Sequence, residues 1–227
     1  MIILFEDYYL LVCNKPSGLS SEIQKHAYPS LEQQCLKYLQ EKFPDRKNYY
    51  LRSVHRLDRA ASGVMIFAKT YTALQNMNAQ IQNRKITKKY LAIVEGVLKK
   101  KEDTLKHWLL KDNWQKKSIV VKPQAKNSKE SLLHYKVLHE YESTSLIIIT
   151  LETGRYHQIR NQFAEINNPI VNDSLYNGKK ISNESSIALH ALSYSIHHPV
   201  SNQLLHFKAE LPDNDIWREI NQEHIIV

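Results

Sequence analysis

The chain has 227 residues, a formal net charge of +8 and a hydrophobic fraction of 42%, values that favour a folded core in one domain or two small ones. No apolar run is long enough to span a bilayer, and the N-terminal residues lack the basic region of a secretory signal peptide. The two cysteines are too few for a disulfide framework. We therefore expect a cytoplasmic protein that does not enter a membrane.

Two strands and a helix are expected at the start of the chain. Apolar runs at residues 2–5 and 9–13 predict a pair of strands. Ser30 and Gln33 have the spacing of a capping box, which predicts that a helix begins directly after Ser30. Pro44 would end this helix.

A buried strand and a second helix are expected next. Residues 63–69 are almost entirely apolar and predict the strand. Thr70 can cap a helix that extends to about residue 84. Helical periodicity predicts that this helix turns three apolar side chains inward: Leu74, Met77 and Ile81.

The middle of the chain alternates between strands and a helix. Residues 86–98 predict a long strand, followed by a looser cationic region with shorter strands. Residues 132–139 and 145–153 predict a hairpin. A helix is expected over residues 155–166, because the breaker at residues 167–169 stops it.

Two closing strands, at residues 187–198 and 203–211, precede a short last helix near Asp213. That helix is expected to bury three apolar side chains: Ile216, Trp217 and Ile220. Many strands with helices inserted between hairpins predict an α+β fold around one large mixed, mostly antiparallel sheet flanked by helices. Nothing in the composition marks a boundary, so we expect residues 1–227 to form a single domain.

The positive charge is concentrated in one segment. Residues 84–129 hold 14 Lys and Arg against four acids, a net charge of +10, and the rest of the chain sums to −2. The same segment contains Tyr90, Trp108 and Trp114. Cations interleaved with aromatic rings suit a nucleic acid, through counterion release and base stacking. A lysine-rich face that only aids solubility would have the same composition.

A first candidate for chemistry is the segment over residues 54–63, which reads His-Arg-Leu-Asp-Arg around Asp58. Arg56 and Arg59 flank Asp58, and nearby positive charge holds a carboxylate in its ionised form. An ionised and oriented carboxylate can attack an electron-poor carbon. The alternative is a structural salt bridge at the entry to a strand.

A second candidate is Arg160, in the segment over residues 153–160. An arginine at the edge of a core needs a carboxylate partner, and Asp58 would serve. The alternative is a surface arginine that pairs with Glu165 or with solvent. His157 falls on the far side of the expected helix, whose buried stripe would be Tyr156, Ile159, Phe163 and Ile166.

The third candidate is Tyr90, in the apolar strand that follows Lys88 and Lys89. Strand alternation places Tyr90 on the same face as Ala92 and Val94. A tyrosine in a strand is far more often a packing residue than a catalytic one. Tyr90 becomes a candidate for chemistry only in combination with Asp58 and Arg160.

Taken in order, these segments resemble the RluA-type family of RNA pseudouridine synthases. The likeness extends from about residue 10 to residue 211, nearly the whole chain. The segments that carry it are Leu11–Leu19, His55–Asp58 with Ser62-Gly63, Lys88–Gly96, Gly154–Arg160 with Pro169-Ile170 and Asp173-x-x-Tyr176, and Leu189–Leu192 with His198-Pro199. The chain departs from the family pattern at Ala61, Tyr156 and Asn172, where threonine, threonine and glycine are usual.

The resemblance implies an isomerase that detaches uracil from ribose, turns it and rejoins it through carbon 5. Asp58 would be the nucleophile, attacking either the ribose or the base or assisting a glycal route. Arg160 would pair with Asp58, and Tyr90 would pack against the uracil and help remove the carbon-5 proton. The uridine must leave the helical stack, and Arg56 would enter the vacated space.

The resemblance also implies an RNA partner, ribosomal or transfer RNA, and a monomer. Many members of the family carry an accessory RNA-binding domain, but none is expected here, because the turn at residues 14–18 comes so early in the sequence. Lys88, Lys89 and Arg155 would contact phosphates. No redox step or second substrate is involved, so no cofactor is expected. The histidines show no metal-ligand spacing, so no metal is expected either.

Two other classes of function fit parts of the pattern. An RNA-binding module or chaperone would keep the basic segment but would not need Asp58, Tyr90 and Arg160 together. A phosphodiesterase or another hydrolase would use the histidines, and it would require a metal and cleave the strand.

Overall fold

The computed structural model describes residues 1–23, 29–183, 185–218, 220 and 222–225. The chain forms two compact units, and each unit is built from two separate stretches of the sequence. Unit 1 comprises residues 1–88 and 191–212, and unit 2 comprises residues 89–190 and 213–227. Each unit is described by itself.

The strands of unit 1 pair in an antiparallel manner. They are β1 (Ile2–Glu6), β2 (Leu10–Lys15), β3 (Arg52–Ser53), β4 (Ser62–Ala68), β10 (Leu189–His197, in unit 1 from residue 191) and β11 (Leu204–Lys208). β2 lies between β1 and β4, β3 also pairs with β4, and β10 pairs with β11. The expected strands at the two ends of the chain are confirmed. All seven residues of β4 are buried, which agrees with their apolar sequence.

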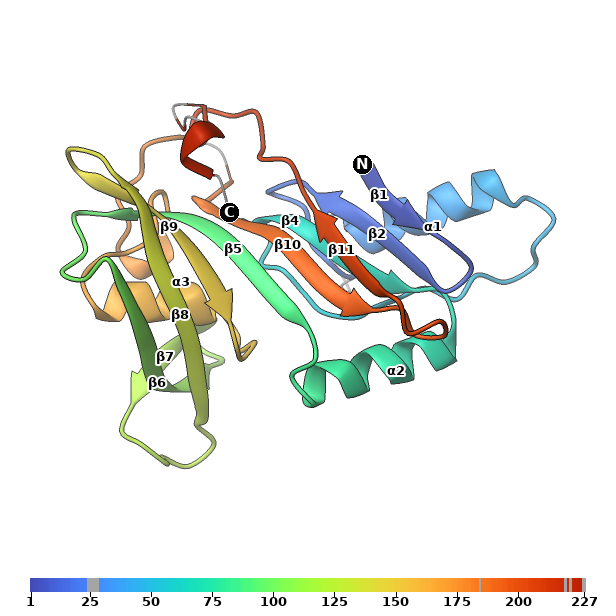
Figure 1. Cartoon of the computed structure of the whole chain (residues 1–227), viewed down its shortest axis with the longest axis horizontal. Helices are drawn as coiled ribbons and strands as arrows, with labels where there is room; N and C mark the ends of the chain where they lie inside the picture. The colour runs from blue at the N-terminus through green and yellow to red at the C-terminus, as the bar shows by residue number, and fades with distance from the viewer. Residues whose placement is uncertain (24–28, 184, 219, 221, 226–227) are drawn as a thin grey trace. The chain divides into compact units, whose positions relative to one another are not determined.

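Both expected helices of unit 1 form where their caps predict (Figure 1). Helix α1 (Leu31–Lys42) begins after Ser30, whose side chain accepts from the backbone of Gln33, while the Gln33 side chain accepts from the Ser30 backbone at 3.0 Å. Helix α2 (Tyr71–Gln82) begins after Thr70.

The inward face of α2 differs from the expected one. Ala73, Met77 and Gln80 are its buried residues, whereas Leu74 and Ile81 are only partly buried. The Gln80 side chain is buried because it bonds the backbone of His197 through both of its polar ends, at 2.7 and 3.0 Å. A polar side chain can thus occupy the helix face that periodicity assigns to apolar residues.

Unit 2 is built on five antiparallel strands. They are β5 (Thr87–Glu95, in unit 2 from residue 89), β6 (Glu102–Asp112), β7 (Lys117–Val121), β8 (Lys129–Glu140) and β9 (Thr144–Leu151). Their order is β5-β9-β8-β6-β7. The expected hairpin of β8 and β9 is confirmed. The cationic region is more regular than expected. β6 has 11 residues, of which residues 108–112 pair with β7 and residues 102–109 pair with β8.

Helix α3 (Gln158–Glu165) starts three residues later than expected. His157 precedes it in the left-handed region, with φ of 51°, so residues 155–157 cannot belong to the helix. The shift removes Tyr156 from the expected buried stripe. Ile159, Arg160 and Phe163 are buried, and α3 packs against β6 and β7 (Figure 1).

The helix predicted near Asp213 is not found there, but the burial predicted for its apolar side chains is confirmed. The described residues 215–218 form turns, and a 3-10 helix, η2, follows at Gln222–Ile225; residues 219 and 221 lie outside the described residues. Asn214 closes the turn by accepting from the backbone of Trp217. The three expected apolar side chains, Ile216, Trp217 and Ile220, are buried.

The α+β class with a large, mostly antiparallel sheet flanked by helices is confirmed. In the described part of the chain, no helix is long and apolar enough to cross a bilayer. That residues 1–227 act as a single domain stays a prediction.

Candidate active-site residues

Asp58 lies on a loop of unit 1 between β3 and β4, and the backbone of this loop is held on both sides. Ser21 Oγ donates to the carbonyl of Leu57 at 2.7 Å and accepts from the Leu57 N–H at 3.0 Å. On the other side, the Gly18 N–H donates to the carbonyl of Arg59 at 2.7 Å. The Asp58 carbonyl itself accepts from the backbone of Ala61 at 3.1 Å. The loop therefore holds the half-buried Asp58 in a defined position.

A buried lysine supports the same loop. Lys15 is fully buried at the end of β2, and its ammonium group donates to the carbonyls of Pro16 at 2.9 Å, Leu19 at 2.8 Å and Arg59 at 3.3 Å. Burial lowers the pKa of Lys15 to about 7, against the attraction of Asp58, which raises it. Sequence analysis assigned no role to Lys15. The available signal was a charged residue at the end of an apolar strand.

His55, three residues before Asp58, is a packing residue. Its ring stacks on the ring of Tyr194 with centroids 4.4 Å apart. Nε2 accepts from the Ile66 N–H at 3.3 Å, which leaves the proton on Nδ1 to be donated to the Tyr194 hydroxyl at 3.3 Å. Burial, and after it the positive charge of Lys88, lowers the pKa of His55 to about 3. His55 is therefore neutral, and it fixes the entry to the loop.

Arg56 projects from this loop into solvent. Its side chain is 65% exposed, and Nη1 lies 3.5 Å from a carboxylate oxygen of Glu22. An exposed ion pair of this length contributes little to stability and leaves the arginine able to move. The position is compatible with the expected entry into an RNA stack.

In unit 2, Tyr90 lies in β5 opposite Ile149 of β9 and is 6% exposed. It packs in the core, as most strand tyrosines do. Lys88 and Lys89, directly before it, are both partly buried. Their expected contacts with phosphates stay predictions.

Arg160 has a partner that sequence analysis did not identify. It is buried in α3, and its Nε and Nη2 donate to the two carboxylate oxygens of Asp173 at 2.6 and 2.8 Å. The guanidinium carbon also lies 5.1 Å from the ring centroid of Tyr176. The alternative of a surface arginine paired with Glu165 or solvent is therefore wrong. A guanidinium has five N–H donors, and Asp173 occupies two of them. The expected pair of Arg160 with Asp58, which lies in the other unit, stays a prediction.

The Tyr176 hydroxyl joins α3 to β7. It accepts from the Ser118 N–H at 2.8 Å and lies 3.1 Å from Nδ1 of His157. Asn161 of α3 donates to the Ser118 carbonyl. Both named residues of the Asp173-x-x-Tyr176 motif therefore contact Arg160: Asp173 bonds its guanidinium, and the Tyr176 ring lies against it.

One of the departures from the family pattern, Asn172, has a local explanation. Asn172 replaces glycine at a φ of 66°, a conformation that asparagine tolerates better than other side chains. Its side chain also donates to the Ser186 carbonyl at 2.6 Å and accepts from the backbone of Ile181 at 3.0 Å. Ala61 is buried, beside the backbone turn at Asp58.

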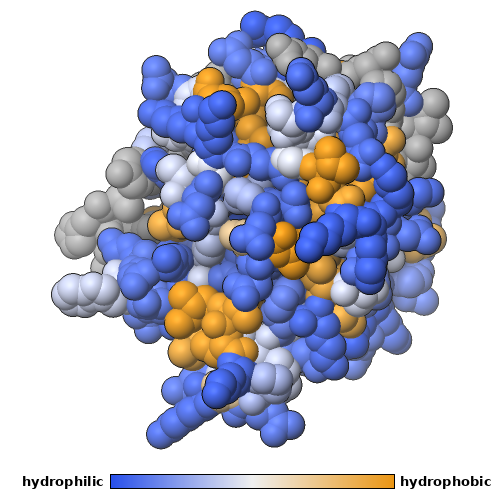
Figure 2. Space-filling view, turned by 90° about the vertical axis from the view of Figure 1, so that its left-hand side faces the viewer, coloured by the Kyte–Doolittle hydropathy of each residue, from blue (hydrophilic) through white to orange (hydrophobic). Residues whose placement is uncertain are grey.

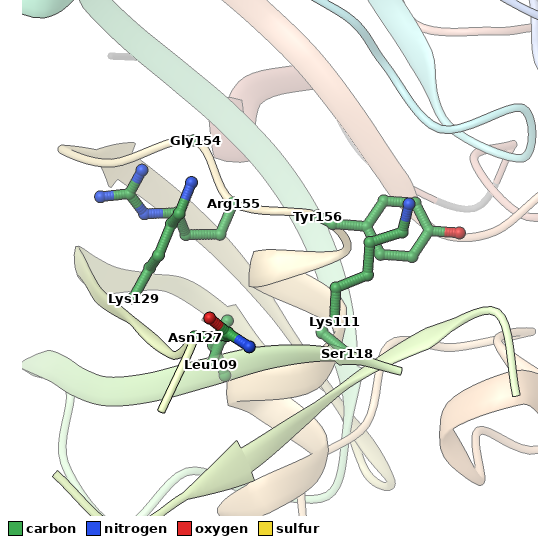
Figure 3. A pocket seen from close by; sticks show the side chains of 8 residues that line it. All are labelled: Leu109, Lys111, Ser118, Asn127, Lys129, Gly154, Arg155 and Tyr156. Atoms are coloured by element: carbon green, nitrogen blue, oxygen red, sulfur yellow. The ribbon is translucent and has the colours of Figure 1, made fainter. Parts of the chain in front are cut away.

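A cationic pocket of about 220 Å³ lies in unit 2 (Figure 3). Arg155, exposed and anchored through its Nε to the Glu130 carbonyl at 3.0 Å, forms one side. Tyr156 forms another and donates to the Lys116 carbonyl at 3.0 Å. The further polar side chains that line the pocket are Lys111, Ser118, Asn127 and Lys129.

Two of the histidines that a metal-dependent hydrolase could use have other contacts. His198 Nε2 lies 2.7 Å from an Asp7 oxygen, and His206 Nδ1 lies 2.8 Å from the Ser195 hydroxyl. Over residues 1–23, 29–183, 185–218, 220 and 222–225, no three His, Cys, Asp or Glu side chains gather as metal ligands would.

Comparison with known proteins identifies related sequences. Residues 9–165 match a family model described as RNA pseudouridylate synthase. A ribosomal large subunit pseudouridine synthase C of Buchnera aphidicola (subspecies Baizongia pistaciae) is 39% identical over 205 residues, which cover 87% of this chain and 63% of the relative. YhcT of Bacillus subtilis, named an uncharacterized RNA pseudouridine synthase, is 32% identical over 213 residues, which cover 92% of this chain and 68% of that protein. The chain thus spans about two thirds of the length of these relatives.

Solved structures share the fold. Human RNA pseudouridylate synthase domain containing 4 superposes with a TM-score of 0.75 at 22% identity, covering 93% of this chain and 89% of that one. Human RNA pseudouridylate synthase domain containing 1 superposes with a TM-score of 0.72, also at 22% identity, covering 93% of this chain and 83% of that one. At this identity, the likeness concerns the fold.

Proposed function

Because this chain belongs to the RluA-type family of RNA pseudouridine synthases, we propose that it is an isomerase that converts specific uridines of structured RNA to pseudouridine. The observation that carries the proposal is the Asp58 loop. Its backbone is bonded from Ser21 on one side and from Gly18 on the other. A loop fixed in this way presents a carboxylate for attack without the entropy cost of ordering it.

Asp58 is the nucleophile of the proposed reaction. The bond between uracil nitrogen 1 and the ribose breaks, the base turns, and carbon 5 bonds to the ribose. The carbon-5 proton is lost to solvent, and nitrogen 1 takes up a proton in its place. Substrate and product are isomers, so no cofactor enters. Arg160 pairs with Asp58 and keeps it charged, and Tyr90 packs against the uracil. Arg160 can serve in this way because Asp173 and Tyr176 already hold its side chain.

The target uridine leaves its stack before it reacts, at a cost of a few kcal/mol. Arg56 enters the space that the base vacates. In support, Arg56 is exposed and its only ion pair among the described residues is a loose one with Glu22. Lys88, Lys89 and Arg155 contact phosphates and offset the cost of flipping.

Large-subunit ribosomal RNA is the proposed substrate, because a relative at 39% identity is named for that activity; transfer RNA is the second candidate. A cytoplasmic location and a monomeric state stay predictions. Cys13 and Cys35 are compatible with a reducing compartment, since their sulfur atoms lie 3.6 Å apart as free thiols, far beyond the ~2.05 Å of a disulfide.

The test is the Asp58→Asn variant, assayed by tritium release from RNA that carries [5-³H]uridine. Isomerisation should be abolished while RNA binding, measured by filter retention, is kept. Asp213→Asn is the control, because that side chain is 95% exposed at a distance in sequence from the loop. Equal tritium release by the wild type and Asp58→Asn contradicts the proposal. Strand cleavage that depends on a metal would instead support a hydrolase, and binding without either reaction would support a binding module.

A further inference from the structure

Trp114 lies at the tip of the β6–β7 hairpin and is 94% exposed. Tryptophan normally buries most of its large ring, so a tryptophan that is almost fully exposed to solvent contributes little to the stability of the fold. Three lysines flank it at this end of the hairpin: Lys111, Lys116 and Lys117.

The turn that carries Trp114 is held in one conformation. A carboxylate oxygen of Asp112 accepts from the backbone of Trp114 at 2.9 Å and of Gln115 at 3.0 Å. From the segment that precedes α3, the Tyr156 hydroxyl donates to the Lys116 carbonyl at 3.0 Å. A ligand that stacks on Trp114 would therefore order little additional backbone, which favours binding.

The cationic pocket adjoins the same hairpin. Lys111 pairs with Ser118 across the two strands, so both pocket-lining residues stand three or four positions from Trp114. Lys111, Lys129 and Arg155 supply three positive charges, and none of the residues that line the pocket is a carboxylate (Figure 3). The nearby Glu130 is occupied by Lys106, whose ammonium group lies 2.9 Å from it. Such a pocket attracts a phosphate group.

Six of the eight residues that line the pocket have polar side chains, which suits a polar partner. One face of the molecule, shown in Figure 2, is mostly hydrophilic, with its apolar residues in separate patches. Large continuous apolar areas mark protein-binding surfaces, whereas the lining of this pocket is cationic. A nucleic acid requires cations and single aromatic rings, which this hairpin provides.

We propose that the β6–β7 hairpin is a second RNA-binding element, in which Trp114 stacks on an unpaired base and the pocket of Lys111, Lys129 and Arg155 holds a phosphate of the same strand. The proposal rests on the proposed RNA substrate and deepens it. It assigns the hairpin to unpaired nucleotides, because a base inside a duplex does not offer its face to a tryptophan ring.

Fluorescence tests the stacking directly. The chain has three tryptophans, so the emission of the wild type is compared with that of Trp114→Phe while oligouridylate is added. Stacking on Trp114 should quench the wild-type emission, and the substitution should remove most of this quenching. Quenching that is the same in both proteins would overturn the role of Trp114.

Binding tests the specificity. Trp114→Ala should weaken binding of a single-stranded oligouridylate about tenfold and should leave binding of an RNA duplex of equal length unchanged. Tyr71→Ala is the matched control, since Tyr71 is an exposed aromatic residue of α2. Circular dichroism verifies that each variant folds.

The phosphate site is tested by salt dependence. Lys129→Ala should reduce the slope of log Kd against log salt by about one unit for the single strand, whereas Lys37→Ala, an exposed lysine of α1, should not. Equal single-strand affinity of Trp114→Ala and wild type, or equal losses on duplex and single strand, would overturn the inference. These assays measure binding, so they are independent of whether Asp58→Asn loses isomerisation.

Discussion

Arg160 and Asp173 form a buried two-point ion pair, with Nε and Nη2 of the arginine 2.6 and 2.8 Å from the two carboxylate oxygens. The side chains are 7% and 1% exposed. The pair satisfies the charge of an arginine that we propose to act beside Asp58. It also fixes the direction of the guanidinium, which a single contact would leave free to rotate.

Asp173→Asn should therefore destabilise the protein by about 3–5 kcal/mol, because it removes a buried carboxylate that pairs with the Arg160 charge. It should also lower the rate of isomerisation. Urea unfolding and the tritium-release assay measure the two effects.

Asp215→Asn is the matched control for this change. Asp215 forms an ion pair with Arg218 at 3.1 Å, but both side chains are more than half exposed, so its loss should cost less than about 1 kcal/mol. A free energy of unfolding that is equal in the two variants would show that the Arg160–Asp173 pair does not stabilise the fold.

Gly63→Ala should unfold or severely destabilise unit 1. Gly63 has φ of +115°, and an added Cβ would lie 2.2 Å from the carbonyl oxygen and 2.5 Å from the nitrogen of Ala191. Backbone cannot move as a flexible side chain can, so we expect a loss of several kcal/mol. The strand that begins here supports the Asp58 loop, and activity should fall with stability.

Gly154→Ala is the control for this glycine, because an added Cβ there meets nothing within 4 Å. Thermal unfolding followed by circular dichroism should show a lowered Tm for Gly63→Ala only. Similar Tm values for both variants and the wild type would contradict the close approach of β4 to Ala191.

The stability of the protein should fall as the pH decreases from about 6.5 towards 3, in part because of His55. The folded pKa of about 3 lies below the usual histidine value of 6.5, so the unfolded chain takes up a proton that the folded chain does not. Above pH 6.5 both states are neutral at this site and its contribution is complete. Below it, the free energy of unfolding should decrease by roughly 1 kcal/mol per pH unit.

His55→Gln should remove this component, because the amide oxygen can still accept from the Ile66 N–H but does not titrate. The measurement is urea unfolding at a series of pH values. His206→Gln, at an exposed histidine of β11, should keep the wild-type slope. The same slope in His55→Gln as in the wild type would show that His55 does not titrate as its burial implies.

Local signals in the sequence were sufficient for most elements of the fold. Ser30 and Thr70 cap the two helices that they predicted, since a cap depends only on residues within one turn. The apolar run of β4 is buried throughout. The start of α3 could not be predicted in the same way, because the left-handed His157 is held by contacts with Tyr156 and Tyr176 that are not read from helical periodicity.

In the candidate site, too, some features could be predicted from local sequence and others depend on packing. The family, the order of the motifs and the candidates Asp58, Tyr90 and Arg160 could be identified from the sequence, because the spacing of motif residues is fixed along the chain. The partners became visible only after folding: Asp173 for Arg160, and three carbonyls for the buried Lys15. Buried charges take their partners from whichever segment lies beside them after folding, and that proximity is a property of packing, which no local pattern records.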